Sequence, residues 1–261
     1  MAPAPVPPTP RRLPDPPGPH SGPHSGVGAG ADERPVVLDR RVGPFGEIVL
    51  RRHGGLLQII ANGCFLMDTS DGRSERLLVR AALAELAGRE RPPAAPRLLV
   101  GGLGVGFSLA EAAAEPRWGA IEVVEREPAV IDWHRSGPLA AHSGGALDDP
   151  RVTLVESDLL ARLHSAPGRF DALCLDIDNG PDWTVTEDND GLYAPAGLAA
   201  CRAALADGGV LVVWSAQDSA TFPDRLRNAG FASVRTEEVS VARGVPDVLF
   251  LASHHFASRS A

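Results

Sequence analysis

The chain of 261 residues contains no lysine, and all 25 of its basic residues are arginines. This absence excludes enzymes that hold a carbonyl substrate or pyridoxal through a lysine Schiff base, and it excludes a P-loop, whose lysine contacts the phosphates. Arginine stays protonated in proteins, so it can bind anions but seldom acts as a general base. A GC-rich codon bias is the simplest explanation of the composition, and the exclusions hold whatever its cause.

Several other features are scarce. The three cysteines lie far apart and show no metal-type spacing, as in a protein of a reducing compartment. No histidine has the spacing of a metal ligand, so no metal is expected. No apolar run approaches the ~20 residues of a membrane span, and the N-terminus lacks the apolar core of a signal peptide. The net charge of −8, without a basic stripe, argues against nucleic acid as a partner. We therefore expect a cytoplasmic protein.

The composition divides the chain into four segments. Residues 1–35 hold 11 of the 24 prolines and no aromatic residue, which predicts a disordered tail. Residues 36–73 alternate in polarity between turn residues, and Asn62-Gly63 is a strong hairpin signal, so a small antiparallel β-domain is expected there. Residues 74–253 form the main domain, and residues 254–261 are expected to be a flexible tail.

Strands and helices alternate through the main domain, which predicts a mostly parallel sheet covered by helices on both faces. The last two strands follow each other without a helix, so they should form an antiparallel pair at one edge. The fold class is therefore a doubly wound α/β sheet of seven strands. The expected strands are 97–100, 120–124, 152–156, 172–175, 209–214, 233–239 and 248–251. The expected helices are 74–86, 106–114, 127–135, 158–163, 195–206 and 219–229.

The sharpest local signal is the segment from Leu98 to Gly106, where an apolar strand runs into four glycines, Gly101, Gly102, Gly104 and Gly106, that open a helix. Such glycines let the backbone turn tightly and let a ligand approach it closely. Glu125 ends the second strand, about where an acid binds ribose hydroxyls in nucleotide-binding sheets. Asp158, after the third strand, could accept from an adenine amino group. Together they predict a nucleoside site.

An acidic segment follows the fourth strand. Residues 171–190 contain seven acids, and no arginine or histidine lies between Arg169 and Arg202. Asp176 and Asp178 come directly after a buried strand, at the sheet edge where open α/β sheets bind ligands. Carboxylates there would attract a cationic amine, and one could take its proton so that the nitrogen attacks a carbon on a sulfonium. Trp183, within this segment, could form an apolar wall for an alkyl chain or anchor the loop. Gln217, after the strand expected at 209–214 and near the same sheet edge, could hydrogen-bond an acceptor substrate.

These residues resemble the spermidine synthase (polyamine aminopropyltransferase) family, which shares the class I methyltransferase fold. The resemblance covers about Phe45 to Ser253. It implies transfer of an aminopropyl group from decarboxylated S-adenosylmethionine to a polyamine, with Asp176 as base and Asp178 aiding substrate binding. It also assigns Glu125 to the ribose, Asp158 to the adenine side and the Leu192-Tyr193 pair to the substrate site, and it suggests a homodimer.

The chain departs from the family pattern at several positions. Leu103 and Val105 lie in the glycine motif where an aspartate is usual, and Glu47 replaces a glutamine. The acidic loop is shorter before Gly180-Pro181, and Ser74-Glu75 stands for an Asp-Glu pair at the start of a helix, which makes Glu75 a candidate substrate-binding residue. These departures keep two alternatives open: a methyltransferase that uses intact S-adenosylmethionine, and a non-catalytic member that binds a nucleoside.

Overall fold

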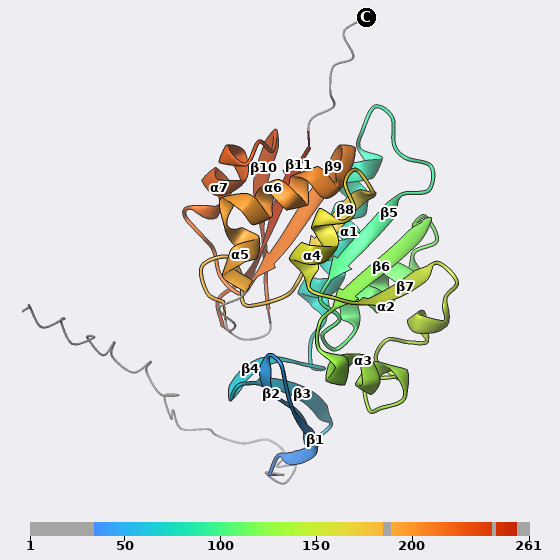
Figure 1. Cartoon of the computed structure of the whole chain (residues 1–261), viewed down its shortest axis with the longest axis vertical. Coiled ribbons are helices and arrows are strands. Elements are labelled where there is room, and N and C mark those ends of the chain that lie inside the picture. The colour runs from blue at the N-terminus through green and yellow to red at the C-terminus, as the bar shows by residue number, and fades with distance from the viewer. Residues whose placement is uncertain (1–33, 185–188, 242–243, 255–261) are drawn as a thin grey trace, which may run out of the picture. The chain divides into compact units, whose positions relative to one another are not determined.

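The computed structural model describes residues 34–184, 189–241 and 244–254. The described chain begins with a four-stranded antiparallel sheet whose strands pair in sequence order (Figure 1). A tight turn at Asn62 and Gly63, both with positive φ, joins the last two strands, so the hairpin predicted from Asn-Gly is present. The strands are β1 (Val36–Gly43), β2 (Gly46–His53), β3 (Leu56–Ala61) and β4 (Cys64–Asp68).

A seven-stranded sheet follows, in the order β10-β11-β9-β8-β5-β6-β7. The five strands from β9 to β7 are parallel to one another, whereas β11 is antiparallel to both β9 and β10. The predicted fold class and the antiparallel pair at one edge are thus confirmed. The strands are β5 (Arg97–Gly101), β6 (Ala120–Glu125), β7 (Val152–Glu156), β8 (Phe170–Leu175), β9 (Leu205–Ser215), β10 (Ser233–Val239) and β11 (Asp247–Ser253).

Helices cover both faces of this sheet because neighbouring residues of each strand point to opposite sides. On β5, Leu98 and Val100 belong to one buried cluster with residues of α1, α2 and α3, while Leu99 belongs to another with residues of α4, α6 and α7. The helices are α1 (Arg73–Ala87), α2 (Phe107–Ala114), α3 (Pro128–Arg135), η1 (Ala146–Asp148), α4 (Leu159–His164), α5 (Asp190–Tyr193), α6 (Pro195–Ala204) and α7 (Phe222–Asn228).

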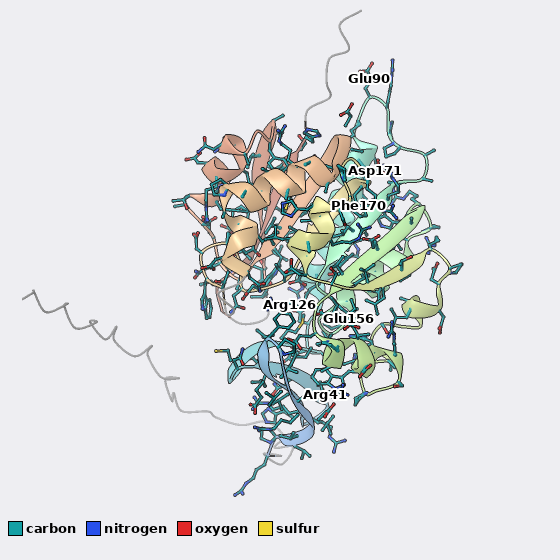
Figure 2. All side chains as sticks on the ribbon, viewed as in Figure 1. Arg41, Glu90, Arg126, Glu156, Phe170 and Asp171 are labelled. Carbon is teal, nitrogen blue, oxygen red and sulfur yellow. The ribbon has the colours of Figure 1, made fainter. Side chains whose placement is uncertain are left out.

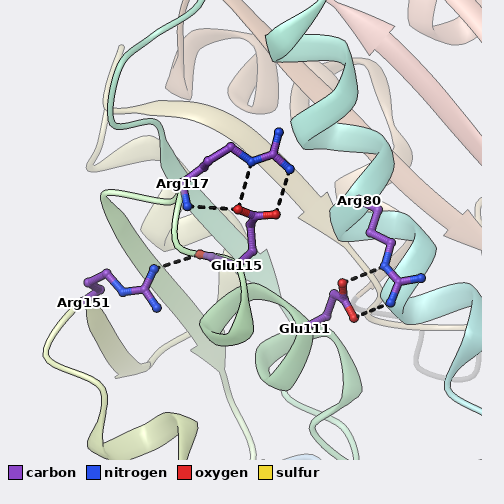
Figure 3. Close-up of polar contacts among 5 residues, drawn as sticks. All are labelled: Arg80, Glu111, Glu115, Arg117 and Arg151. Carbon is purple, nitrogen blue, oxygen red and sulfur yellow. Dashed lines mark hydrogen bonds and ion pairs between the residues drawn. The ribbon is translucent and has the colours of Figure 1, made fainter.

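Two of these helices matter for the site because each begins at it. α1 starts beside the small sheet, and α2 starts at the end of the glycine loop. The two pack together and are joined by the two-pronged ion pair of Arg80 with Glu111 (Figure 3), whose closest atoms are 2.6 Å apart. Next to it, Glu115 holds Arg117 through both carboxylate oxygens. The Arg80–Glu111 pair thus joins the middle of α1 to the middle of α2.

The element boundaries differ from the sequence prediction at one place in particular. Leu205 and Ala206 were expected to end a helix, but they begin β9, where Leu205 pairs with Phe170. Strand pairing there overrides the helical pattern. Gly208, which has a positive φ, lies where the register between β8 and β9 shifts.

The tail predicted at 1–35 lies outside the described residues except for its last two positions, and only His254 of the second tail is described. No helix of the described chain is long and apolar enough to cross a bilayer.

Candidate functional site

The loop between β5 and α2 requires glycine. Gly102, Gly104 and Gly106 have φ values of +91°, +49° and +96°, which residues with side chains rarely adopt. A Cβ atom on Gly102 would overlap the backbone oxygen of Asp176, and one on Gly104 would overlap the sulfur of Met67. The loop can therefore lie directly against the end of β8 on one side and against the small sheet on the other.

Glu125, the last residue of β6, organises this loop. One carboxylate oxygen accepts a hydrogen bond from the backbone N–H of Leu103 at 2.9 Å, and the other accepts from Arg126 N and Glu127 N, both at 2.8 Å. A carboxylate offers about four acceptor positions, so the side chain can still accept from a further donor such as a ribose hydroxyl. Glu125 is thus a structural residue of the loop as well as a candidate ligand-binding residue.

A first cavity lies at the carboxyl ends of β5, β6 and β7, where open α/β sheets bind ligands. Gly101 ends β5 beneath it, and a Cβ atom there would come within 2.9 Å of the side chains of Leu159 and Leu175. Asp158 caps α4 by accepting from Ala161 N at 2.9 Å through Oδ1. The cavity is lined by Gly102, Val124, Glu125, Arg126, Ser157, Asp158, Leu159, Ile177 and Asn189. It therefore brings together Gly102 of the glycine loop, Glu125 and Asp158, whereas the predicted Gly101 and Gly106 do not line it.

A second cavity adjoins the first and shares Glu125, Arg126, Ile177 and Asn189 with it. It lies between the seven-stranded sheet and the small sheet, which supplies about half of its lining. The remaining lining residues are Phe45, Glu47, Ile48, Ile59, Ala61, Asn62, Leu66, Met67, Gly104, Glu127, Val130 and Asp178. A ligand that fills the first cavity can extend into the second without leaving the protein.

An acidic cleft lies between β4, the start of α1 and the start of β11. Its acidic residues come from two places in the sequence: Asp68, Asp71 and Glu75 lie within eight residues of one another, and Asp247 lies far along the chain. Asp247 Oδ2 accepts from Ser74 Oγ at 2.5 Å and from Trp214 Nε1 at 3.1 Å. The other lining residues are Leu56, Ser70, Arg73, Ser74 and Val241. Four carboxylates against one arginine make this cleft suited to a cation.

Asp176 is electrostatically coupled to this cleft. Burial raises the pKa of Asp176 above the usual carboxyl range, and the charge of Asp247 raises it further. Burial also raises the pKa of Glu75, and the charge of Asp176 adds to that shift. Carboxyl groups that are buried near each other hold protons more tightly, because each negative charge disfavours the next. Strong perturbation in a cleft is typical of functional groups.

Two other acids of the segment after β8, Asp178 and Asp182, lie in different places. Asp178 accepts from Asn189 Nδ2 at 2.8 Å and lines the second cavity, together with Asn189 itself. Asp182 forms an ion pair with Arg225 of α7. The sequence shows no cation within this segment, but the fold brings Arg225 to it from more than forty residues away. The acidic segment is therefore partly neutralised at Asp182 and not at Asp176.

Three further predicted substrate residues lie outside these cavities. Tyr193 is 2% exposed and packs edge-on against Phe222, with 5.8 Å between ring centroids. Its hydroxyl lies near Asp176 and Asp178, whose charges add to burial in raising its pKa. Trp183 is 56% exposed, and Gln217 is exposed beyond the end of β9. Glu75, by contrast, lies in the acidic cleft.

Sequence reasoning missed the residues that complete the cleft. Asp247 begins β11 and reaches the site only because β11 inserts between β9 and β10. Asp68 ends β4, and Asp71 lies in the connection from β4 to α1. An acid at the start of an apolar strand, or in a connection before a helix, carries no functional signal by itself. Asn189 was also missed, although it lies in the acidic segment.

The departures from the family pattern are buried or paired. Leu103 is 4% exposed and Val105 is fully buried, so both belong to the core. Glu47 forms an ion pair with Arg40 at 2.6 Å. The positions where an aspartate is usual in the glycine motif therefore offer no polar group to a ligand.

Comparisons with known proteins agree with this geometry. No protein-family model matches the chain. The chain is 31% identical over 206 residues to a polyamine aminopropyltransferase of Mycobacterium tuberculosis, which covers 75% of this chain but 37% of that protein. It is 36% identical over 121 residues to polyamine aminopropyltransferase 1 of Pseudomonas aeruginosa, 46% of this chain and 40% of that protein. The chain thus spans about two-fifths of the length of these curated relatives.

Solved structures share the fold. A spermidine synthase from Thermotoga maritima superposes with a TM-score of 0.67 over 84% of this chain and 72% of that one, at 19% identity. A spermidine synthase in complex with the transition-state analogue AdoDATO gives a TM-score of 0.69 over 84% of this chain and 73% of that one, at 18% identity. At such identities the superpositions show the fold alone. Sequence and fold together confirm the predicted resemblance.

Proposed function

We propose that this chain, as a relative of the polyamine aminopropyltransferases, transfers an aminopropyl group from decarboxylated S-adenosylmethionine to a cationic amine. The nucleoside of the donor would occupy the first cavity, its aminopropyl arm the second cavity, and the amine the acidic cleft. Support comes from the named relatives and from the acceptor and donor cavities that flank the end of β8. The placement of each substrate is part of the proposal.

One observation carries the proposal. Asp176 follows β8 and lines neither site, but it is close to both: its backbone oxygen lies against Gly102 of the glycine loop, while its carboxylate responds to the charge of Asp247 in the acidic cleft. A group with a raised pKa in this position is a better base near neutral pH than an ordinary carboxylate. It can therefore take a proton from a bound ammonium next to the donor.

The reaction then follows from standard chemistry. Asp176 accepts one proton from the ammonium, which frees the nitrogen lone pair. That lone pair forms a bond to the aminopropyl methylene carbon attached to the sulfonium. The bond between this carbon and sulfur breaks, and its electrons stay on sulfur. The products are a secondary amine, which is protonated in water, and methylthioadenosine. Holding both reactants at this geometry removes most of the entropic barrier to their encounter.

The charge of the second cavity favours the decarboxylated donor. Glu125, Glu127 and Asp178 line it together with Glu47, which is paired with Arg40, and Arg126 is the arginine among the lining residues. A terminal ammonium is attracted there, whereas the extra carboxylate of intact S-adenosylmethionine would face like charges. In this proposal the acids of the second cavity supply the negative charge that is missing at positions 103 and 105, where the chain has leucine and valine.

A methyltransferase that uses intact S-adenosylmethionine is the second candidate, because the buried Leu103 and Val105 remove the acid that the family usually places near the donor ammonium. The donors of the two candidate reactions have the same nucleoside and differ in the side chain on sulfur, which carries a carboxylate only in intact S-adenosylmethionine. Each donor should therefore be offered with putrescine, and methylthioadenosine and S-adenosylhomocysteine measured as the respective products.

The proposal predicts methylthioadenosine from the decarboxylated donor only in the presence of amine. Asp176→Asn should abolish this turnover while methylthioadenosine still binds in calorimetry. Asp182→Asn is the matched control, because Asp182 lies in the same acidic segment but is paired with Arg225. Turnover in Asp176→Asn equal to that of the control would refute the base assignment. Release of S-adenosylhomocysteine instead would establish the second candidate.

A further inference from the structure

Arg126 occupies the wall between the first and second cavities. It directly follows Glu125, whose carboxylate accepts its backbone N–H at 2.8 Å, and it lines both cavities. Figure 2 labels it where the seven-stranded sheet meets the small sheet. An arginine at this position faces whatever ligand the two cavities share.

The guanidinium of Arg126 rests on an aromatic ring. Its Cζ atom lies 4.4 Å from the centroid of Phe45, which stands in the turn between β1 and β2. Within the described chain Arg126 forms no ion pair, although Glu47 and Asp178 line the same cavity. The side chain is thus held by the small sheet rather than by a carboxylate.

We propose that Arg126 binds the donor's nucleobase, with the guanidinium between the ring of Phe45 and the face of the base. This inference rests on the proposed nucleoside site and extends it to a residue outside the sequence motifs. A guanidinium is planar and weakly hydrated, so one face can lie on Phe45 while the other stays open to a second π-system. Every nucleobase offers such a face.

The stack makes the small sheet part of the base site. Phe45 does not reach the first cavity itself, since it lines only the second. It acts through Arg126, as a positioning residue, by fixing the plane of the guanidinium. The two side chains should therefore contribute to nucleoside affinity as a coupled pair rather than independently.

The test is calorimetry with methylthioadenosine on the full chain. Arg126→Leu keeps an apolar wall but removes the cation, and we expect its dissociation constant to rise about 3- to 20-fold, the range of one cation–π contact. Arg126→Lys keeps the charge without the planar face and should remain weaker than the wild type. Phe45→Leu should weaken binding, and the double variant Phe45→Leu/Arg126→Leu should bind no worse than Arg126→Leu alone.

Arg41→Leu is the matched control. Arg41 also joins the small sheet to the main sheet, through Asp132 of α3 at 2.7 Å, but it lines neither cavity, so its loss should leave affinity unchanged. Thermal melts of all variants establish that they fold. If wild-type protein binds methylthioadenosine and Arg126→Leu binds equally well, or if the two losses simply add, this inference is overturned alone. If wild-type protein does not bind methylthioadenosine, the proposed nucleoside site fails.

Discussion

The Nε2 atom of His134 lies 2.9 Å from the backbone oxygen of Gly104. The imidazole is 2% exposed, and burial lowers its pKa, so the ring is neutral near pH 7 and donates its Nε2–H to the carbonyl. Its Cε1 atom is also 2.8 Å from the position that a Cβ atom would take on Gly106. A histidine on α3 therefore fastens the middle of the glycine loop.

We expect His134→Gln to keep this bond, because the glutamine amide nitrogen reaches about as far as Nε2. His134→Asn is too short and should weaken methylthioadenosine binding about 3- to 10-fold, the effect of one hydrogen bond. Calorimetry on both variants measures the difference. Equal affinities in the two variants would show that the bond does not hold the loop.

Gly102→Ala should destabilise the protein and abolish nucleoside binding. The new Cβ atom would overlap the backbone oxygen of Asp176, which is not free to move as a flexible side chain is. Gly63→Ala is the matched control, since Gly63 also has positive φ but no atom within 4 Å of the new Cβ. The control should cost about 1–2 kcal/mol from backbone strain, and Gly102→Ala about 1–3 kcal/mol more from overpacking. Urea unfolding of both variants checks the order, which the reverse ranking would contradict.

The stability of the protein should depend on pH through Asp176. Its pKa is raised in the folded state, so the folded protein holds this proton more tightly than the unfolded chain does. Stability is therefore lost as the pH rises above about 4, the ordinary aspartate range, towards the raised value. Asp176→Asn removes this loss and should gain stability over the wild type at pH 8 but not at pH 4. Denaturation at both pH values measures it, and an equal difference at the two would contradict the assignment.

Removing the charge of Asp247 should shift the pH dependence of turnover. Asp247 raises the pKa of Asp176, so Asp247→Asn should lower it and move the acidic limb of the kcat/KM profile to lower pH. Asparagine retains an oxygen that can accept from Ser74 and Trp214, which bond Asp247 in the wild type. An acidic limb that stays in place or moves to higher pH would show that the charge of Asp247 does not raise the pKa of the base.

The first cavity, where we propose that the nucleoside binds, was predictable from sequence because it follows the βα rhythm. Strand periodicity locates the ends of β5 and β6, and residues at those ends meet at one edge of a parallel sheet. That Glu125, Asp158 and Gly102 of the glycine loop line one cavity could therefore be predicted without any knowledge of side-chain packing. The hairpin at Asn62-Gly63 was predictable for a similar reason, since only a few residue types accept positive φ there.

The acidic cleft was not predictable, because its residues are brought together by long-range pairing. Asp247 reaches the cleft through the pairing of β11 with β9, which no local pattern encodes. Tyr193 was expected at the substrate site, but the short helix α5 directs it into a cluster with Phe222, where burial of its ring prevails. Asp178, two residues beyond Asp176, lies in the second cavity beside Asn189.

The acidic cleft and the first cavity have no lining residue in common. Two reactants that enter by separate routes need not wait for each other, so donor and acceptor should associate in random order and form a ternary complex. Double-reciprocal plots of initial velocity against donor concentration, at several fixed amine concentrations, should then intersect. Either product should inhibit the reaction, and no covalent enzyme intermediate should form. Under the proposed function, the separation of the acidic cleft from the first cavity thus predicts a random order of substrate binding.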